Sequence, residues 1–367
     1  MQIDAAVLRE REHAFAIETL ELEDPRVDEV LVRLVATGIC HSDLAVRSGD
    51  LPLPLPIVLG HEGSGIVEAV GSRVTRVSPG DRVVLTFAFC GSCIPCRTGH
   101  PVYCVQSAAM NLTGTRLDKS TAYRRGSEQV YGHFVGQSSF ATHALVHESA
   151  AVKVSHDVSL ELLAPLGCGI QTGAGSVINV FRPPYGSSLA VTGTGSVGLS
   201  AIMAASVVGC QTIVAVDISE SRLKLAAELG ATHTVNSSGG DLTEQLLDVT
   251  NGEGLNFCLD TTGLQQVIGS AFGALATRGR LGLVGVSPAG TRIDLDPWAM
   301  LRGLVVDGNM EGDVVPDTFI PYLIDLHQQG RFPFDRLVTA CGDLSAINEA
   351  VAATQSGEIV KAVLHLS

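Results

Sequence analysis

Residues 189–198 read Leu-Ala-Val-Thr-Gly-Thr-Gly-Ser-Val-Gly, an apolar run followed by three glycines in a Gly-x-Gly-x-x-Gly spacing. The pattern predicts a buried strand, a tight turn at Gly193 and a helix that begins near Gly195. Gly195 would let a ligand approach the backbone, and Gly198 would let the helix pack closely on the strand. Because the first turn of a helix offers unpaired N–H groups and a positive dipole end, the stretch predicts a cradle for a diphosphate.

An acidic residue ends the next apolar run, Val-Ala-Val-Asp at residues 214–217. A carboxylate at this distance from the glycines accepts hydrogen bonds from an adenosine ribose and repels a 2′-phosphate. Asp217 therefore favours NAD over NADP as the coenzyme. The alternative is that the glycines only shape a turn and Asp217 only caps the helix that begins near Ser219.

Strands and helix-length segments alternate around this site. Six apolar strands are predicted, at residues 188–192, 212–217, 232–235, 256–260, 280–286 and 304–308. Such alternation predicts right-handed crossovers and a doubly wound parallel sheet of the α/β class, a Rossmann domain.

The rest of the chain differs, and 367 residues exceed the size, about 250–300, at which a single core stops growing. Short apolar or alternating runs separated by Gly, Pro and Asp predict a mostly β domain over residues 1–155. Within it, the polar stretch 114–129 is expected to be a surface loop or lobe. Residues 156–310 form the predicted coenzyme domain, and residues 311–367 are expected to return to the first domain.

The composition excludes several classes of partner. The chain has 24 Lys and Arg against 38 Asp and Glu, a formal charge of −14, which would repel phosphate backbones and anionic lipids. We therefore expect no nucleic-acid or membrane partner. Residues 183–216 carry no charge, but Gly, Ser and Thr interrupt them, which favours a buried strand and helix over a membrane span. The N-terminal residues contain no apolar secretory signal, so a cytoplasmic location is expected.

Four cysteines lie within fifteen residues of one another: Cys90, Cys93, Cys96 and Cys104. In a cytoplasmic chain this spacing is typical of a loop that holds one zinc ion with four thiolates. A closed four-thiolate shell leaves no position for substrate, so this zinc would be structural. The alternative is four unrelated reduced thiols.

Other possible ligands are dispersed, and a lone cysteine or histidine is more often a core residue than a ligand. They occur in residues 38–43 (Gly-Ile-Cys-His-Ser-Asp), 60–65 (Gly-His-Glu-Gly-Ser-Gly) and 167–173 (Gly-Cys-Gly-Ile-Gln-Thr-Gly). With the cysteine loop and the glycine stretch in the same order, the chain resembles the zinc-dependent medium-chain alcohol dehydrogenases over essentially its full length. Residues 137–142, 170–175 and 329–335 are most similar to the aryl-alcohol (benzyl alcohol) branch, although relatives act on allylic terpenols such as geraniol.

The resemblance implies a catalytic zinc site in a GroES-like first domain. Cys40, His61 and Cys168 would bind the metal and leave its fourth position open. Glu62 would lie behind the metal as an occasional ligand. Asp43 would orient His61 and fix its tautomer.

The resemblance also implies the proton route and the coenzyme contacts. Ser42 would hydrogen-bond the substrate oxygen, but Ala45 stands where liver-type relatives carry the histidine at the outer end of the proton relay. The proton must then leave by another route, through the ribose and His41 or through water. The further implied coenzyme contacts are His41 and Lys361 at the pyrophosphate, Thr172 at the nicotinamide end and Arg222 at the adenosine ribose. For Arg222 and Lys361 a solvated surface position is the alternative.

The chemistry implied is reversible oxidation of primary aryl or allylic alcohols to aldehydes, with NAD and two zinc ions per subunit. An open zinc site lowers the pKa of a bound oxygen acid from about 16 to about 7, which corresponds to roughly 12 kcal/mol. A general base such as Ser42 supplies only about 10²–10⁴-fold. Hydride would then pass from the carbinol carbon to the nicotinamide. Phe87 and Phe89 could stack on the substrate or simply pack in the core.

Two other functions stay open. Glutathione-dependent formaldehyde oxidation would need a cationic anchor for the glutathione carboxylate, and no unambiguous one is visible. A non-catalytic NAD-binding structural protein would not need the intact ligand positions, which also disfavour a zinc-free quinone reductase. Relatives imply a homodimer or homotetramer, with residues 304–308 as the place for an intersubunit sheet.

Overall fold

The computed structural model describes residues 1–154, 158–287 and 290–366, and the chain divides into two compact units. The first unit comprises Met1–Cys168, Val315–Asp325 and Asp335–Ser367, and the second comprises Gly169–Val314 and Leu326–Phe334. The predicted boundary between residues 155 and 156 lies outside the described residues. The units divide between Cys168 and Gly169.

The first unit is built on two β-sheets. The five-stranded sheet has the order β4 (Ile57–Val58), β1 (Gln2–Leu8), β2 (Ala16–Leu22), β7 (Tyr123–Arg125), β8 (Glu128–Val130). The second sheet has the order β10 (Ala151–Lys153), β6 (Arg82–Leu85), β5 (Gly63–Val70), β3 (Glu29–Gly38), β18 (Lys361–His365), β17 (Val338–Asp343), and β9 (His143–His147) also pairs with β3. Short helices join the strands: α1 (His41–Ser48), α2 (Ile94–Arg97), α3 (Ser107–Asn111) and α4 (Leu160–Leu163).

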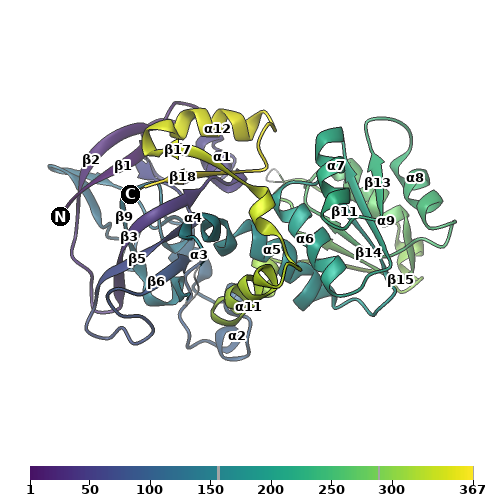
Figure 1. Ribbon diagram of the computed structural model, residues 1–367, viewed down its shortest axis with the longest axis horizontal. Helices are drawn as coiled ribbons and strands as arrows, with labels where there is room; N and C mark the ends of the chain where they lie inside the picture. Colours follow the sequence, from purple (N-terminus) through teal and green to yellow (C-terminus); the bar gives the residue numbers. More distant parts are fainter. Residues whose placement is uncertain (155–157, 288–289, 367) are drawn as a thin grey trace. The chain divides into compact units, whose positions relative to one another are not determined.

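The C-terminal strands complete this unit. Figure 1 shows β17, β18 and α12 (Ile347–Gln355), drawn in yellow, beside the purple N-terminal strands. Strand β18 runs antiparallel to β3, and Ile39 N–H donates to the carbonyl of Ala362 at 3.0 Å. This pairing brings Lys361, the first residue of β18, next to the start of α1.

The polar stretch 114–129 is not simply a surface loop. It contains β7 and the first residues of β8, which form an antiparallel hairpin in which Tyr123 pairs with Val130. The Tyr123 side chain is fully buried in the first unit's core. Part of the expected loop or lobe is thus a hairpin, because a buried aromatic residue anchors an otherwise polar segment.

The second unit contains the predicted doubly wound sheet (green in Figure 1). Its order is β13 (His233–Asn236), β12 (Thr212–Asp217), β11 (Ser188–Thr192), β14 (Leu255–Asp260), β15 (Leu275–Leu283), β16 (Val305–Gly308). All the pairings are parallel. Helices α6 (Ser196–Val207), α7 (Glu220–Glu228), α8 (Leu242–Val249), α9 (Gln265–Gly273) and α10 (Pro297–Met300) join the strands. The α/β class and the Rossmann topology are therefore confirmed.

Burial explains the uncharged stretch at residues 183–216. Leu189, Ala190 and Val191 of β11 are completely buried, and so is the middle of α6. A strand in the middle of a sheet and a helix packed on it are buried on nearly all sides, so apolar side chains are favoured on every face. Across the residues that the structure describes, no helix combines the length and apolarity needed to span a membrane.

Candidate active site and metal sites

Four side chains from three parts of the first unit converge on one point. Cys40 precedes α1, His61 and Glu62 lie between β4 and β5, and Cys168 ends the first long segment of the unit. One potential ligand atom from each lies within 4.8 Å of the others. The structure therefore brings together the three predicted zinc ligands and Glu62, although more than a hundred residues separate Cys40 from Cys168 in the sequence.

Asp43 ties two of these ligands together. It occupies the third position of α1, where its Oδ2 accepts a hydrogen bond from the Cys40 N–H at 3.1 Å, as in a capping box. Its Oδ1 accepts from the Gly60 N–H at 2.9 Å and lies 3.1 Å from Nδ1 of His61. One buried carboxylate thus fixes the start of α1, the loop before β5 and the imidazole ring.

The other ring nitrogen of His61 has the character of a metal ligand. With Nδ1–H directed at Asp43, Nε2 carries the lone pair, and it is buried without a hydrogen-bond partner among the described residues. Phe134 packs edge-on against the ring, with centroids 5.1 Å apart. Burial opposes a charge on the ring, but Asp43 and Cys40 outweigh it and raise the pKa of His61 well above its usual value. The surroundings therefore favour a positive charge at this ring, which a metal ion bound at Nε2 would supply in place of the second proton.

Glu62, one of the four converging residues, forms a buried ion pair with Lys361. Nζ of Lys361 donates to Oε1 of Glu62 at 2.7 Å and to the carbonyl of Ile39 at 3.1 Å. Oε2 of Glu62 is buried and has no partner in the described part of the chain. Burial raises the pKa of Glu62 to about 7, against the opposing charge of Lys361. Lys361 is thus an internal residue rather than a solvated surface one, and its contact with a pyrophosphate stays a prediction.

The thiol of Cys40 is set up to lose its proton. A hydrogen bond with Cys168 and the positive charges of Lys361 and His61 hold its pKa well below the usual value, in spite of burial. Two thiols, an imidazole nitrogen without a partner and a carboxylate oxygen form the donor set of an open zinc site. The residues therefore fit zinc.

Gln137 is a supporting residue that the sequence did not reveal. Its Nε2 donates to the His61 carbonyl at 2.8 Å, and its Oε1 accepts from the Gly63 N–H at 3.0 Å. The side chain is fully buried. These two hydrogen bonds hold the backbone on either side of Glu62. No spacing signal identifies Gln137, because nothing in sequence distinguishes it from a surface glutamine.

Ser42, His41 and Ala45 lie on α1 beside the cluster. Ser42 and Ala45 are half-buried, and His41 is exposed at the beginning of the helix. Phe87 and Phe89 are both buried, with ring centroids 6.0 Å apart, and the Arg76 guanidinium lies 5.6 Å from the centre of the Phe89 ring. Phe89 therefore packs against Phe87 and Arg76, as the core-packing alternative predicts.

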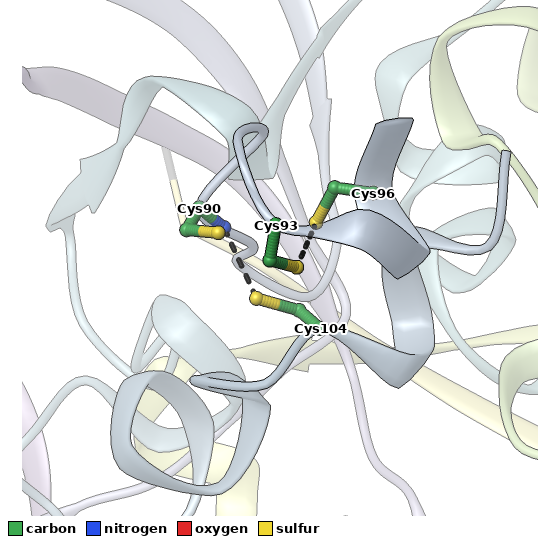
Figure 2. A group of neighbouring side chains, drawn as sticks. All are labelled: Cys90, Cys93, Cys96 and Cys104. Atoms are coloured by element: carbon green, nitrogen blue, oxygen red, sulfur yellow. Dashed lines mark hydrogen bonds between the residues drawn. The ribbon is translucent and has the colours of Figure 1, made fainter. Parts of the chain in front are cut away.

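The four-cysteine loop forms a second cluster in the same unit. Figure 2 shows the sulfur atoms of Cys90, Cys93, Cys96 and Cys104 turned toward one another, and they lie within 4.8 Å of each other. Helix α2 carries Cys96 and begins directly after Cys93. Gly91 and Gly99 adopt left-handed backbones on either side of it, with φ of 69° and 89°, which lets the loop turn twice.

The charge state of the loop fits a tetrahedral zinc site. Hydrogen bonds from Ser92 lower the pKa of Cys90 to about 6, whereas burial and the Cys93 thiol raise that of Cys96 to about 12. The backbone N–H groups of Cys90 and Gln106 both donate to Sγ of Cys104 at 3.4 Å. Some thiols are thus ready as thiolates, and a bound cation would supply the attraction that deprotonates the others.

The glycine stretch of the second unit has the geometry of a phosphate cradle. Gly193 has a φ of 88°, and a Cβ at Gly198 would lie 1.9 Å from the carbonyl oxygen of Gly193. A Cβ at Gly195 would meet nothing within 4 Å. Among the residues that the structure describes, no side chain caps the first turn of α6. Gly193 is required by its left-handed backbone and Gly198 by close packing, whereas Gly195 leaves space in front of the N-terminus of α6.

The carboxylate of Asp217 is already engaged with this turn. Its Oδ2 accepts from the N–H and the hydroxyl of Thr194, both at 2.7 Å, and its Oδ1 accepts from the N–H groups of Ile218 and Ser219. These four contacts use its ordinary acceptor capacity, so a ribose hydroxyl must share or displace Thr194. Arg222 lies beside the turn, with Nη1 3.4 Å from the Thr194 carbonyl.

Thr172 lies on α5 (Gly169–Gly175), the helix that follows Cys168. Its hydroxyl donates to Oε2 of Glu311 at 3.3 Å, and Nε2 of Gln171 donates to the same oxygen at 3.0 Å. Neither Gln171 nor Glu311 was predicted as a site residue.

Comparison with known proteins agrees with this arrangement. The alcohol dehydrogenase GroES-like domain family matches residues 26–156, and the zinc-binding dehydrogenase family matches residues 196–329. Geraniol dehydrogenase from Castellaniella defragrans is 46% identical over 98% of this chain and 96% of its own length.

Two solved structures have nearly the same fold. An alcohol dehydrogenase zinc-binding domain protein from Burkholderia ambifaria is 50% identical, with a TM-score of 0.97 over 100% of this chain and 99% of its own. Benzyl alcohol dehydrogenase from Acinetobacter calcoaceticus is 44% identical, with a TM-score of 0.96 over the full length of both chains.

Proposed function

The chain belongs to the zinc-dependent medium-chain alcohol dehydrogenase family, and from this premise we propose that it oxidises primary aryl or allylic alcohols reversibly with NAD. The observation that carries the proposal is the convergence of Cys40, His61 and Cys168, in which Nε2 of His61 has no hydrogen-bond partner among the residues described. The similarity to both a geraniol and a benzyl alcohol dehydrogenase supports a substrate whose carbinol carbon is next to a double bond or an aromatic ring.

The two cysteine-containing clusters would each hold one zinc ion, one catalytic and the other structural. Cys40, His61 and Cys168 would hold a catalytic zinc, with Glu62 within reach as an alternate ligand. Cys90, Cys93, Cys96 and Cys104 would enclose a structural one. Bound at the first site, zinc would supply a Lewis acid that makes the alcohol proton acidic near neutral pH.

The chain's own residues position the reactants and move the proton. Asp43 keeps the Nδ1 proton on His61, so that Nε2 faces the ligand cluster. Ser42, two residues after Cys40 in the first turn of α1, would accept the alcohol proton at its Oγ. Ala45 provides no relay group one turn further on, so the proton would leave through the exposed His41 or through water.

The second unit would bind the coenzyme. Its glycine stretch would hold the pyrophosphate at the N-terminus of α6. Asp217 would contact the adenosine ribose and disfavour a 2′-phosphate. Arg222 lies beside the Thr194 carbonyl, which is consistent with its expected place near that ribose.

We further propose a homodimer or homotetramer. Strand β16 pairs only with β15 in the described sheet, and Val305 on it is 44% exposed. An open edge of this kind is suited to pairing with a second copy. Light scattering on the purified protein measures the assembly, and a monomer would overturn this part of the proposal.

The activity is tested by following NADH formation with benzyl, cinnamyl, geranyl and short aliphatic alcohols. We expect the highest kcat/KM for the first three. If ethanol is oxidised with a higher kcat/KM than benzyl alcohol, the aryl or allylic assignment fails while the family assignment stands. Activity that requires glutathione and formaldehyde would favour the formaldehyde dehydrogenase alternative. One zinc per chain and no turnover would favour a non-catalytic role.

A matched variant tests the role of Ser42. Ser42→Ala removes the hydroxyl without touching a zinc ligand, and kcat should fall by about 10²–10⁴-fold with the zinc content unchanged. Ser48→Ala, at the exposed end of the same helix, should leave kcat unchanged. A Ser42→Ala enzyme with full activity would show that the proton leaves by another route.

A further inference from the structure

The segment 309–313 lies at the edge of the six-stranded sheet where a nucleotide is expected. It directly follows β16, and all six strands run parallel, so it is on the same carboxyl edge as the glycine stretch after β11. The strand order reverses between β11 and β14, the point at which doubly wound sheets bind their ligands. The half with β11, β12 and β13 carries the phosphate cradle and Asp217. The half with β14, β15 and β16 is therefore left for the second nucleotide, the nicotinamide one.

Glu311 in this segment is held by two side chains of α5. Oε2 of Glu311 accepts hydrogen bonds from Nε2 of Gln171 and from the hydroxyl of Thr172. Helix α5 in turn packs directly on α6, since a Cβ at Gly173 would lie 2.0 Å from the Val197 carbonyl oxygen. The Glu311 carboxylate is thus fixed to α5, and α5 packs against α6, the helix that begins at the glycine stretch.

The backbone around Glu311 is also fixed in an unusual conformation. Glu311, Gly312 and Asp313 have successive φ values of 49°, 64° and 48°, all in the left-handed region. A Cβ at Gly312 would lie 2.7 Å from the Gln171 carbonyl oxygen, and one at Gly175 would lie 2.6 Å from the carbonyl oxygen of Gly312. Left-handed runs with non-glycine residues persist only where their surroundings impose them, and they cluster at ligand sites. The segment therefore holds the carboxylate at a set place instead of leaving it on a free loop.

We propose that Glu311 biases coenzyme binding toward the oxidised form, and the proposal rests on the proposed use of a nicotinamide coenzyme. The nicotinamide ring carries a positive charge in NAD⁺ and none in NADH. A carboxylate held in the nicotinamide half of the site attracts the first and is nearly indifferent to the second. NAD⁺ and NADH differ only at this ring, so the attraction between Glu311 and the positive ring adds to the affinity for NAD⁺ and not to that for NADH.

The test measures binding without an alcohol. The zinc-loaded protein is titrated calorimetrically with NAD⁺ and with NADH, for the wild type and for Glu311→Gln, which removes one negative charge whatever else the carboxylate contacts. We expect the Kd of NAD⁺ to rise roughly three- to tenfold, the range for one charge at several ångströms in a partly solvated site, while the Kd of NADH changes less than about twofold. Glu311→Asp keeps the charge and should largely restore the wild-type ratio.

Glu253→Gln is the matched control. Glu253 is an exposed residue of the same unit just before β14, at the opposite edge of the sheet, so its loss should leave both Kd values unchanged. Equal weakening of NAD⁺ and NADH by Glu311→Gln would mean that Glu311 only supports α5, and it would overturn the proposal. Kd values that stay unchanged for both forms would overturn it as well.

A wild-type measurement covers the case in which Glu311→Gln does not fold. The Kd ratio of NAD⁺ to NADH should rise between low and high salt, because screening weakens the attraction of Glu311 for the positive ring, which NADH lacks. A ratio independent of salt would count against the proposal. A wild type that binds neither form would overturn the coenzyme proposal itself, whereas binding with an unchanged ratio overturns only the role of Glu311. If the wild type prefers NADP⁺ and NADPH, the same ratio is measured with that pair.

Discussion

Nζ of Lys361 lies 2.7 Å from Oε1 of Glu62, and their side chains are only 2% and 0% exposed. The pair joins the C-terminal strand β18 to the loop that carries His61. Two opposite charges in an apolar interior depend on each other, because either one alone has lost its water without compensation. The last residues of the chain therefore help to hold the proposed catalytic zinc site.

Removing the lysine alone should destabilise the protein. Lys361→Met leaves Glu62 buried without its partner, so the free energy of unfolding should fall by about 3–5 kcal/mol, and Glu62→Gln added to it should recover part of the loss. Chemical denaturation of the zinc-loaded protein measures this. Lys153→Met, which breaks the exposed pair with Asp81, should cost less than about 1 kcal/mol. Equal losses in the two single variants would contradict the buried-pair interpretation.

Asp43→Asn should weaken the catalytic zinc site selectively. The amide cannot accept as strongly from the Cys40 and Gly60 N–H groups, and it no longer favours the Nδ1-protonated ring of His61. We expect zinc affinity at this site to fall about 10–100-fold, measured by competition with a chelator. The zinc of the cysteine loop should stay bound. Asp50→Asn, just beyond the same helix, serves as the control, and loss of neither zinc would argue against this role for Asp43.

Cys96→Ser should remove one zinc ion per chain and leave the other. Three thiols cannot close the tetrahedral shell, so metal analysis should give about one zinc in place of two. Cys341→Ser, on strand β17, should retain both. The loop around residues 90–104 should also become more sensitive to proteolysis. A Cys96→Ser protein that still contains two zinc ions would show that the loop binds none.

Asp217→Asn should change the coenzyme preference. The variant loses a charged acceptor for the ribose, so the Kd of NAD⁺ should rise about five- to tenfold, and it no longer repels a 2′-phosphate, so NADP⁺ should bind more tightly. Calorimetric titration with both coenzymes gives the ratio. Thr194→Val, which removes one competing hydrogen bond to Oδ2, should bind NAD⁺ at least as well as the wild type. An unchanged preference in Asp217→Asn would show that Asp217 serves only the turn.

The second unit could be predicted in detail because its signals are local. Each strand and the glycine stretch occupy a few consecutive residues, and chain handedness then orders the strands. The main departures are at the two ends of β15, predicted over residues 280–286: the strand begins five residues earlier, at Leu275. It ends at Leu283 because the N–H groups of Val284 and Gly285 turn to the carbonyl of Asp260.

The candidate metal sites differ in how far sequence alone could identify them. The spacing of the four cysteines in the loop was enough to predict a zinc site there. Cys40, His61 and Cys168 emerged only through resemblance to a family, since their meeting depends on the pairing of distant strands. No role was predicted for Gln137, although its stretch contributed to the resemblance, or for Glu311, because a buried amide or carboxylate looks the same in sequence as a solvated one.

The two cysteine clusters also differ in when a newly made chain can fill them. All four thiols of the loop emerge from the ribosome within a short interval, so a metal ion can be captured there early in synthesis. The other cluster lacks Cys168 until much later, and its Lys361–Glu62 support forms only after residue 361 has been translated. A chain interrupted before residue 361 would therefore be able to bind the first metal but would lack the complete surroundings of the second.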